Sequence, residues 1–258
     1  MQRYLCVLVI ILACVASSHS SEISKSTSIL CDSLVVLLDK CQDESAIDLM
    51  TDQICTQQLV CDLLLRRYIN AVNSQNYNDS LKYKAALTRM LNLDLDLCSS
   101  YRPAIDKVIN GWGKPQFELC GRAGELYMSA LRESSENGRS QLNAAVDLYE
   151  SLGYNYRMAE ALYALGWKYY STGDYEHALE TFKHAESIAR PIDVPVQLAN
   201  IYLGIANSLK EFPDSIGARL TYLSMAMDHV QICPPNRKSA YIAYTLGYMY
   251  YTIGDYHN

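Results

Sequence analysis

The sequence predicts an all-α fold in which helical hairpins stack side by side as a solenoid. The clearest sign is an internal repeat, because the string LGWKYYSTGDY at residues 165–175 returns as LGYMYYTIGDY at residues 246–256. A weaker copy of its Leu-Gly pair, Leu203-Gly204, lies 38 residues after the first copy and 43 before the last. Spacings of this size are typical of stacked helical repeats. Apolar residues at three- and four-residue spacing elsewhere also indicate helices.

Residues 1–20 have the pattern of a secretory signal peptide. Arg3 precedes an apolar run over residues 4–16, which is shorter than the roughly 20 residues that a membrane-spanning helix needs. A buried first helix is the alternative. Ile-Leu-Ala before Cys14 resembles the lipobox of bacterial lipoproteins, although Leu12 departs from the small residue usual there. We therefore expect an exported protein, either a periplasmic or cell-envelope lipoprotein attached to the membrane by lipid on Cys14, or a secreted one.

A eukaryotic secreted protein is a further alternative, for which Asn78-Asp79-Ser80 is the one glycosylation sequon. The composition disfavours a nucleic-acid partner, because the net charge is −6 and no stripe of Lys and Arg is present. Seven cysteines follow residue 20, an odd number without a Cys-x-x-Cys pair. Most fall on apolar faces of predicted helices, although one disulfide among Cys31, Cys41, Cys55 and Cys61 stays open in an oxidising compartment.

We expect residues 21–115 to form an irregular helical region. Apolar spacing predicts a short helix over residues 26–40, then an antiparallel pair over residues 44–72 and about 80–90. Residues 91–97 alternate Leu with Asn or Asp, which we interpret as a helix end or an extended connector. Four residues that break regular structure then mark residues 99–116 as the seam before the repeats: Pro103, Gly111, Gly113 and Pro115.

Residues 116–258 are predicted to hold the repeats. A divergent helical pair covers residues 117–133 and 139–152, and three units follow over residues 159–192, 197–232 and 240–258. The unit at 197–232 is degenerate, with a longer turn at residues 211–215 and a second helix over about 216–232. The last unit stops after its first helix, so we expect the chain to be a fragment of a longer protein, truncated in this unit.

The unit at residues 159–192 resembles a tetratricopeptide repeat at almost every signature position. Leucines, small residues and aromatic residues stand where the family has them: Leu162, Leu165, Gly166, Tyr169, Gly173, Tyr175, Ala178, Phe182 and Ala185. Arg190 stands where the family usually has Pro. The resemblance implies a right-handed solenoid in which Gly166 and Ala178 let two helix backbones approach, Tyr169 and Phe182 fill the space between them, and Gly173 permits the turn.

In this family the stacked first helices line a groove that binds extended peptides or partner helices. The matching positions are Tyr163, Trp167 and Tyr170 in the first unit, Leu198, Ile201 and Ile205 in the second, and Tyr241, Tyr244, Tyr248 and Tyr251 in the third. None of these residues is Lys or Asn, so the clamp for a terminal carboxylate that the family builds from Lys and Asn is not expected. The alternative is that the aromatic residues only pack helix on helix.

Signals for catalysis are weak. The sequence has no His-Glu-x-x-His, phosphate-binding glycine loop, Gly-x-Ser-x-Gly or Ser-x-x-Lys motif. We interpret His177, His184 and the acidic residues Glu176, Glu180 and Glu186 as solvated, and expect no metal, no cofactor and no enzymatic activity.

The expected function is that of an exported scaffold or adaptor that binds a protein or peptide through its repeats. The alternative is the sensory portion of an envelope signalling regulator whose transmembrane and output modules lie beyond residue 258. Two further alternatives are an enzyme that carries these repeats as accessory structure and a glycan-binding protein.

Overall fold

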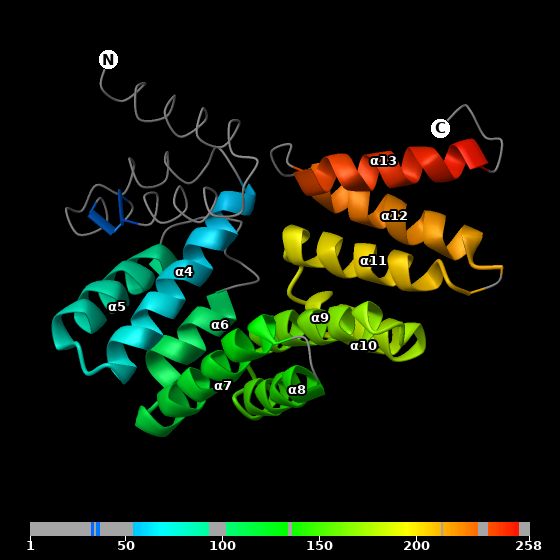
Figure 1. Cartoon of the computed structure of the whole chain (residues 1–258). Helices are drawn as coiled ribbons and strands as arrows, with labels where there is room; N and C mark the ends of the chain where they lie inside the picture. Colours follow the sequence, from blue (N-terminus) through cyan, green and yellow to red (C-terminus); the bar gives the residue numbers. More distant parts are fainter. Residues whose placement is uncertain are drawn as a thin grey trace, which may run out of the picture. The chain divides into compact units, whose positions relative to one another are not determined.

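The computed structural model describes residues 32–33, 35–36, 54–92, 102–133, 136–212, 214–231 and 237–252. Every regular element in these ranges is helical, which confirms the predicted all-α class (Figure 1). Residues 1–20, where the sequence predicts a signal peptide, and Cys14 among them lie outside these ranges. The chain divides into two compact units, Met1–Phe117 with Pro234–Asn236, and Glu118–Cys233 with Arg237–Asn258. None of the described helices combines the length and the apolar character needed to cross a bilayer.

The first unit is built around the pair α4 (Ile54–Asn73) and α5 (Tyr77–Asn92). These two helices pack on each other, as the apolar spacing predicted. Their facing side chains are buried: Cys61, Leu64, Leu65, Tyr68 and Ile69 from α4, and Ala86, Leu87 and Met90 from α5. Gln75, with a φ of +57°, reverses the chain between them. Residues 32–33 and 35–36 are also helical, and residues 37–53, where the predicted helices continue, lie outside the description.

The predicted seam is itself largely helical. It contains α6 (Arg102–Asp106), which continues as the π-helix η2 (Lys107–Gly111). Ile105, Val108 and Ile109 are buried and account for this order. Pro103 lies in the first turn of α6, where its missing N–H costs no intrahelical hydrogen bond.

The second unit begins within α7 (Lys114–Arg132), which is followed by α8 (Glu136–Ser151) and α9 (Asn155–Ser171). Ala130 of α7, Leu142 of α8, and Ala164 and Leu165 of α9 form one buried cluster, against which Tyr127 and Tyr169 pack. The pair that the sequence placed at residues 117–133 and 139–152 therefore exists and packs on the first repeat.

The hairpin of α9 and α10 (Tyr175–Ala189) has the predicted turn. Gly173 adopts a φ of +79°, a left-handed conformation that glycine reaches without a Cβ penalty. Asp174 then caps α10, because its carboxylate accepts a hydrogen bond from the backbone N–H of His177 at 3.4 Å. This local chemistry is what makes the repeated Gly-Asp-Tyr string a turn signal.

The Phe182 ring lies between two helices rather than within one hairpin. A Cβ atom at Gly166 of α9 would lie 2.6 Å from Cε1 of Phe182, and a Cβ atom at Gly204 of α11 (Pro195–Leu209) would lie 2.6 Å from the same atom. The aromatic ring thus occupies the space that a side chain at either glycine would need.

After α11 the chain forms α12 (Ile216–Gln231) and α13 (Arg237–Thr252). Both the longer turn and the second helix of the degenerate unit match the predicted ranges. Consecutive helices from α8 to α13 pack on one another, so this unit is a row of neighbouring helices (Figure 1). Ser208 is fully buried on α11 and bonds back to the Gly204 carbonyl at 3.0 Å, which satisfies its hydroxyl inside the core.

Candidate functional site

The predicted surface residues of α9 form a contiguous aromatic cluster. Tyr163 and Trp167 meet edge to face, with ring centroids 6.2 Å apart, and Trp167 meets Tyr170 at 5.1 Å. The first two rings also contact Phe182 of α10, at 5.9 and 5.6 Å. These residues are therefore partly engaged in helix packing, and each retains some exposed area. Edge-to-face contacts of this kind hold the rings in defined orientations.

Burial and neighbouring groups alter the acidity of this cluster. Burial raises the pKa of Tyr163. Burial also raises the pKa of Tyr170, and the nearby Tyr175, Glu211 and Tyr241 raise it further. Tyr241 belongs to α13, so the end of the α9 cluster lies within electrostatic range of the first residue of the α13 set.

The described residues that the sequence predicted for the groove on α13 are much more exposed than those on α9. The side chains of Tyr241, Tyr244 and Tyr248 are 49%, 71% and 57% exposed. Tyr244 and Tyr248 are one helical turn apart, and their rings lie nearly parallel with centroids 6.5 Å apart. The opposite face of α13 packs inward through the buried residues Ile242 and Met249. The side chain of Tyr251, the fourth predicted residue, lies outside the described residues.

The predicted groove residues of the middle unit are not exposed. The structure buries Leu198, Ile201 and Ile205, which the sequence had placed on the groove side of the second unit. The reason is that α11 packs on α9, α10 and α12 together, so it is enclosed by its neighbours. The exposed aromatic residues are thus separated by a helix whose corresponding positions belong to the core.

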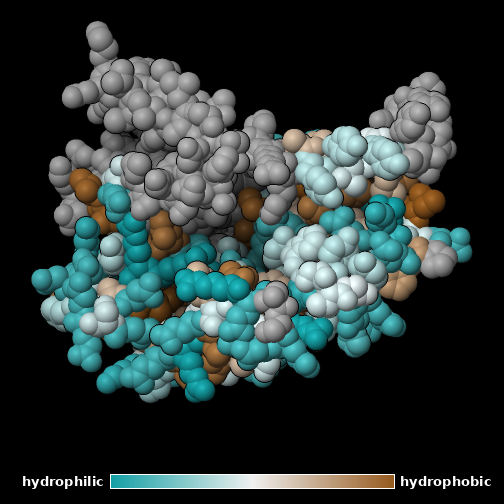
Figure 2. Space-filling model, in the orientation of Figure 1, coloured by the Kyte–Doolittle hydropathy of each residue, from teal (hydrophilic) through white to brown (hydrophobic). Residues whose placement is uncertain are grey.

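The surface of this part of the chain is mildly polar in the space-filling view (Figure 2). In Figure 2, residues of intermediate hydropathy, drawn white, gather over the part of the chain that Figure 1 labels α9 to α13. The large hydrophobic residues that this unit exposes include Tyr241, Tyr244 and Tyr248. Such a surface offers apolar area with hydroxyl groups at its edge rather than a charged patch.

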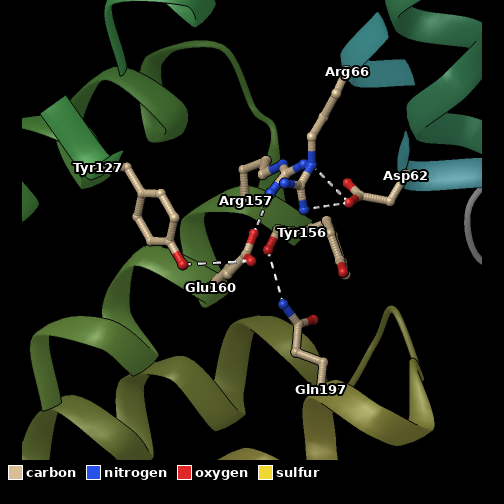
Figure 3. A network of polar contacts seen from close by, with 7 residues as sticks. All are labelled: Asp62, Arg66, Tyr127, Tyr156, Arg157, Glu160 and Gln197. Carbon is tan, nitrogen blue, oxygen red and sulfur yellow. Dashed lines mark hydrogen bonds and ion pairs between the residues drawn. The ribbon is translucent and has the colours of Figure 1, made fainter. Parts of the chain in front are cut away.

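A polar network ties α7, α9 and α11 together (Figure 3). The buried Arg157 guanidinium donates to the Glu160 carboxylate, and the Tyr127 hydroxyl donates to the same carboxylate at 3.5 Å. The amide nitrogen of Gln197 donates to the backbone carbonyl of Tyr156 at 2.9 Å. This network fixes the start of α9, because a buried charge is tolerated only when it is paired.

In the first unit, Figure 3 also shows the pair that Asp62 and Arg66 make within α4. The two Asp62–Arg66 contacts, at 2.9 and 2.6 Å, are bonds between residues one helical turn apart. They keep the buried Asp62 carboxylate compensated.

His177 and His184 are exposed, as predicted, and His177 has a structural role. The Nδ1 atom of the exposed His177 ring lies 2.8 Å from the carboxylate of Asp174. This hydrogen bond raises the pKa of His177 and lowers the pKa of Asp174. The ring also stacks on Tyr169, with centroids 5.4 Å apart.

One of the acidic residues was misassigned from the sequence. Glu176 and Glu180 are exposed, but Glu186 is only 8% exposed and forms an ion pair with Arg190. The spacing of four residues was the signal that could have found this pair. Glu186 also raises the pKa of the buried Tyr202, second to the effect of burial itself.

The described cysteines behave as buried hydrophobic residues. Cys61 and Cys120 are both buried. Burial raises the pKa of Cys120 to about 12, so its reactive thiolate form is disfavoured at neutral pH. The side chains of Cys31, Cys41 and Cys55 lie outside the described residues, so one disulfide among these three and Cys61 stays an open alternative. In the part of the chain that the structure describes, no group of three or more His, Cys, Asp or Glu side chains is arranged to hold a metal ion.

Comparison with protein-family models, with curated proteins and with solved structures yields no match to this chain. The evidence for its function therefore lies in its own residues and their arrangement.

Proposed function

We propose that this chain is a non-enzymatic scaffold or adaptor, with tetratricopeptide-like repeats in a right-handed solenoid, that binds a protein or peptide through the aromatic residues of α9 and α13. The observation that carries the proposal is the exposure of Tyr241, Tyr244 and Tyr248 on a helix whose opposite face is packed. Neighbouring exposed aromatic side chains mark interaction surfaces more often than scattered single ones do.

The chemistry of the surface defines the kind of contact. Each tyrosine that becomes buried against a partner contributes about 1.5–3 kcal/mol through its apolar area, and its hydroxyl can still hydrogen-bond at the edge. No charged residue belongs to the predicted set, so binding should depend only weakly on salt.

The proposal includes export and attachment to the cell envelope through lipid on Cys14. Its support is the pattern of residues 1–20. Expression of the full sequence in a bacterium with labelled palmitate should label the chain and place it in the membrane fraction, whereas C14S should remove both the label and the membrane association. Equal labelling of the two chains would contradict lipidation at this residue.

The binding proposal is tested by selecting peptides from a displayed library on the purified chain. We expect the selected peptides to bind Y244S/Y248S at least tenfold more weakly than the original chain. Y77S is the matched control, because Tyr77 is 72% exposed but belongs to α5 in the first unit. A library that yields no peptide, or peptides that bind the double variant as well as the original chain, would overturn the proposal.

A further inference from the structure

The Phe182 ring of α10 lies where three helices meet. A Cβ atom at Gly166 of α9 and a Cβ atom at Gly204 of α11 would each lie between 2.6 and 2.9 Å from the same three ring atoms, Cδ1, Cε1 and Cζ. One edge of the ring therefore enters a notch between the two glycines. The ring is fully buried, so its packed neighbours fix its position.

The same ring lies against two of the aromatic residues of α9 that are proposed to bind a partner. Tyr163 lies three residues before Gly166 and four before Trp167, so these three positions share one face of α9. The centroid of the Phe182 ring is 5.9 Å from that of Tyr163 and 5.6 Å from that of Trp167, at interplanar angles of 51° and 76°. The orientation of these two partly exposed rings thus depends on the position of the buried ring.

From this arrangement we infer that Phe182 is a positioning residue of the aromatic surface: it holds the rings of Tyr163 and Trp167 in the orientation in which they bind a peptide or protein. The inference rests on the proposed function and names the residue that prepares the α9 surface for binding. Phe182 is fully buried, so it acts through its neighbours and not through contact with the partner. Rings that are already held in place lose less conformational freedom on binding, which favours affinity.

The notch also links the α9 surface to a helix that lies behind it. Gly204 of α11 is buried, so a partner on the surface does not contact it. A methyl group at this position would overlap the Phe182 ring and force it to move within the notch. The ring would then pack differently against Tyr163 and Trp167. A substitution that no partner touches should therefore alter binding on α9.

Fluorine NMR of the full chain tests the positioning role without a partner. The sequence has two tryptophans, so a chain grown with fluorotryptophan gives two resonances, which W112F assigns. We expect F182L and G204A each to shift the resonance of Trp167 and to leave that of Trp112, in the first unit, unchanged. G217A is the matched control, because Gly217 on α12 has open space beside it, and it should shift neither resonance. A Trp167 resonance that stays in place in both variants would overturn the inference.

Peptide affinity tests whether this orientation matters to a partner. The peptides are those selected from the displayed library, and a loss of at least tenfold on W167A identifies the ones that need the α9 surface. We expect F182L and G204A each to weaken these peptides at least fivefold, by calorimetry at a temperature at which circular dichroism shows every variant fully folded. The double variant should bind no more weakly than F182L, because the smaller side chain leaves room for the methyl group.

A further variant separates positioning from a loss of stability. Leu142 of α8 is fully buried in a different cluster, with Ala164 and Leu165 of α9. L142A should therefore lower the free energy of unfolding and leave the peptide affinity of the folded chain unchanged. A loss of affinity in L142A equal to that in G204A would overturn the inference, because destabilisation alone would then explain both.

The remaining outcomes distinguish this inference from the proposed function. Unchanged affinity of F182L and G204A for peptides that need Trp167 would overturn the inference and leave the proposed function in place. Peptides that need Tyr244 and Tyr248 but not Trp167 would do the same, because the rings that Phe182 supports would then take no part in binding. A library that yields no peptide would overturn the proposed function and this role of Phe182 together.

Discussion

At the scale of single residues, the contact between Phe182 and two glycines is the most sensitive feature of the structure. We expect G166A and G204A each to lower the free energy of unfolding by about 1–3 kcal/mol, because the added methyl group would overlap the ring and force it to move. The measurement is urea denaturation followed by circular dichroism.

The chain supplies controls for this prediction. Gly217 and Gly247 are helical and have open space beside them, so G217A and G247A should leave stability unchanged or raise it by up to about 1 kcal/mol through helix propensity. In addition, F182L should reduce the penalty of G166A, because a smaller side chain leaves room for the methyl group. Equal effects of all four glycine substitutions would show that the ring is not tightly held.

Asp174 and His177 give a prediction for pH dependence. The pKa of His177 is raised, so its contribution to stability is present below its unfolded value of 6.5 and is lost as the pH rises through the folded pKa. The pKa of Asp174 is lowered, so its contribution is present above 3.8 and is lost as the pH falls through its folded pKa. The pair therefore supports the start of α10 most between these two limits.

Proton NMR titration of the His177 ring tests the pair directly. D174N removes the carboxylate charge and should move the pKa of His177 downward, toward its ordinary value. Because both side chains are exposed, the effect on overall stability is small. An unchanged titration in D174N would mean that the hydrogen bond does not form in solution.

At the scale of helices, α11 and α13 differ in how they are held. Residues along the whole length of α11 are buried, whereas among the described side chains of α13 only Ile242 and Met249 are buried. Local opening requires less free energy where fewer apolar contacts are broken. We expect amide hydrogen exchange, measured by mass spectrometry, to be at least tenfold faster in α13 than in α11.

A selected library peptide whose binding needs Tyr244 and Tyr248 offers a control for this exchange experiment. Bound peptide should slow exchange in α13 and leave exchange in α5 of the first unit unchanged. Equal exchange rates in free α11 and α13 would contradict the contrast that the structure gives between an enclosed helix and a helix with one open face.

At the scale of whole units, the sequence was most informative where local signals dominate. The apolar spacing predicted α5, α7, α8, α12 and the end of α4 within a few residues, and the Gly-Asp-Tyr string predicted the turn at Gly173. It was less informative over the seam, where Pro103 and Gly111 suggested irregular structure and the structure has α6 and η2. Buried Ile105, Val108 and Ile109 make these residues helical, a contact that local spacing does not reveal.

For the candidate site, too, some features follow from the sequence and others only from the tertiary structure. The sequence by itself determined that this chain is helical, where most hairpins turn, and which aromatic residues share a helical face, because propensity, periodicity and turn chemistry act over a few residues. Only the tertiary structure decided that Leu198, Ile201 and Ile205 belong to the core, that Glu186 is buried, and that Phe182 fills a space bounded by Gly166 and Gly204 while the space at Gly247 is open. Burial depends on which distant segments come together, and a repeated string has the same side chains whether or not another helix lies against it.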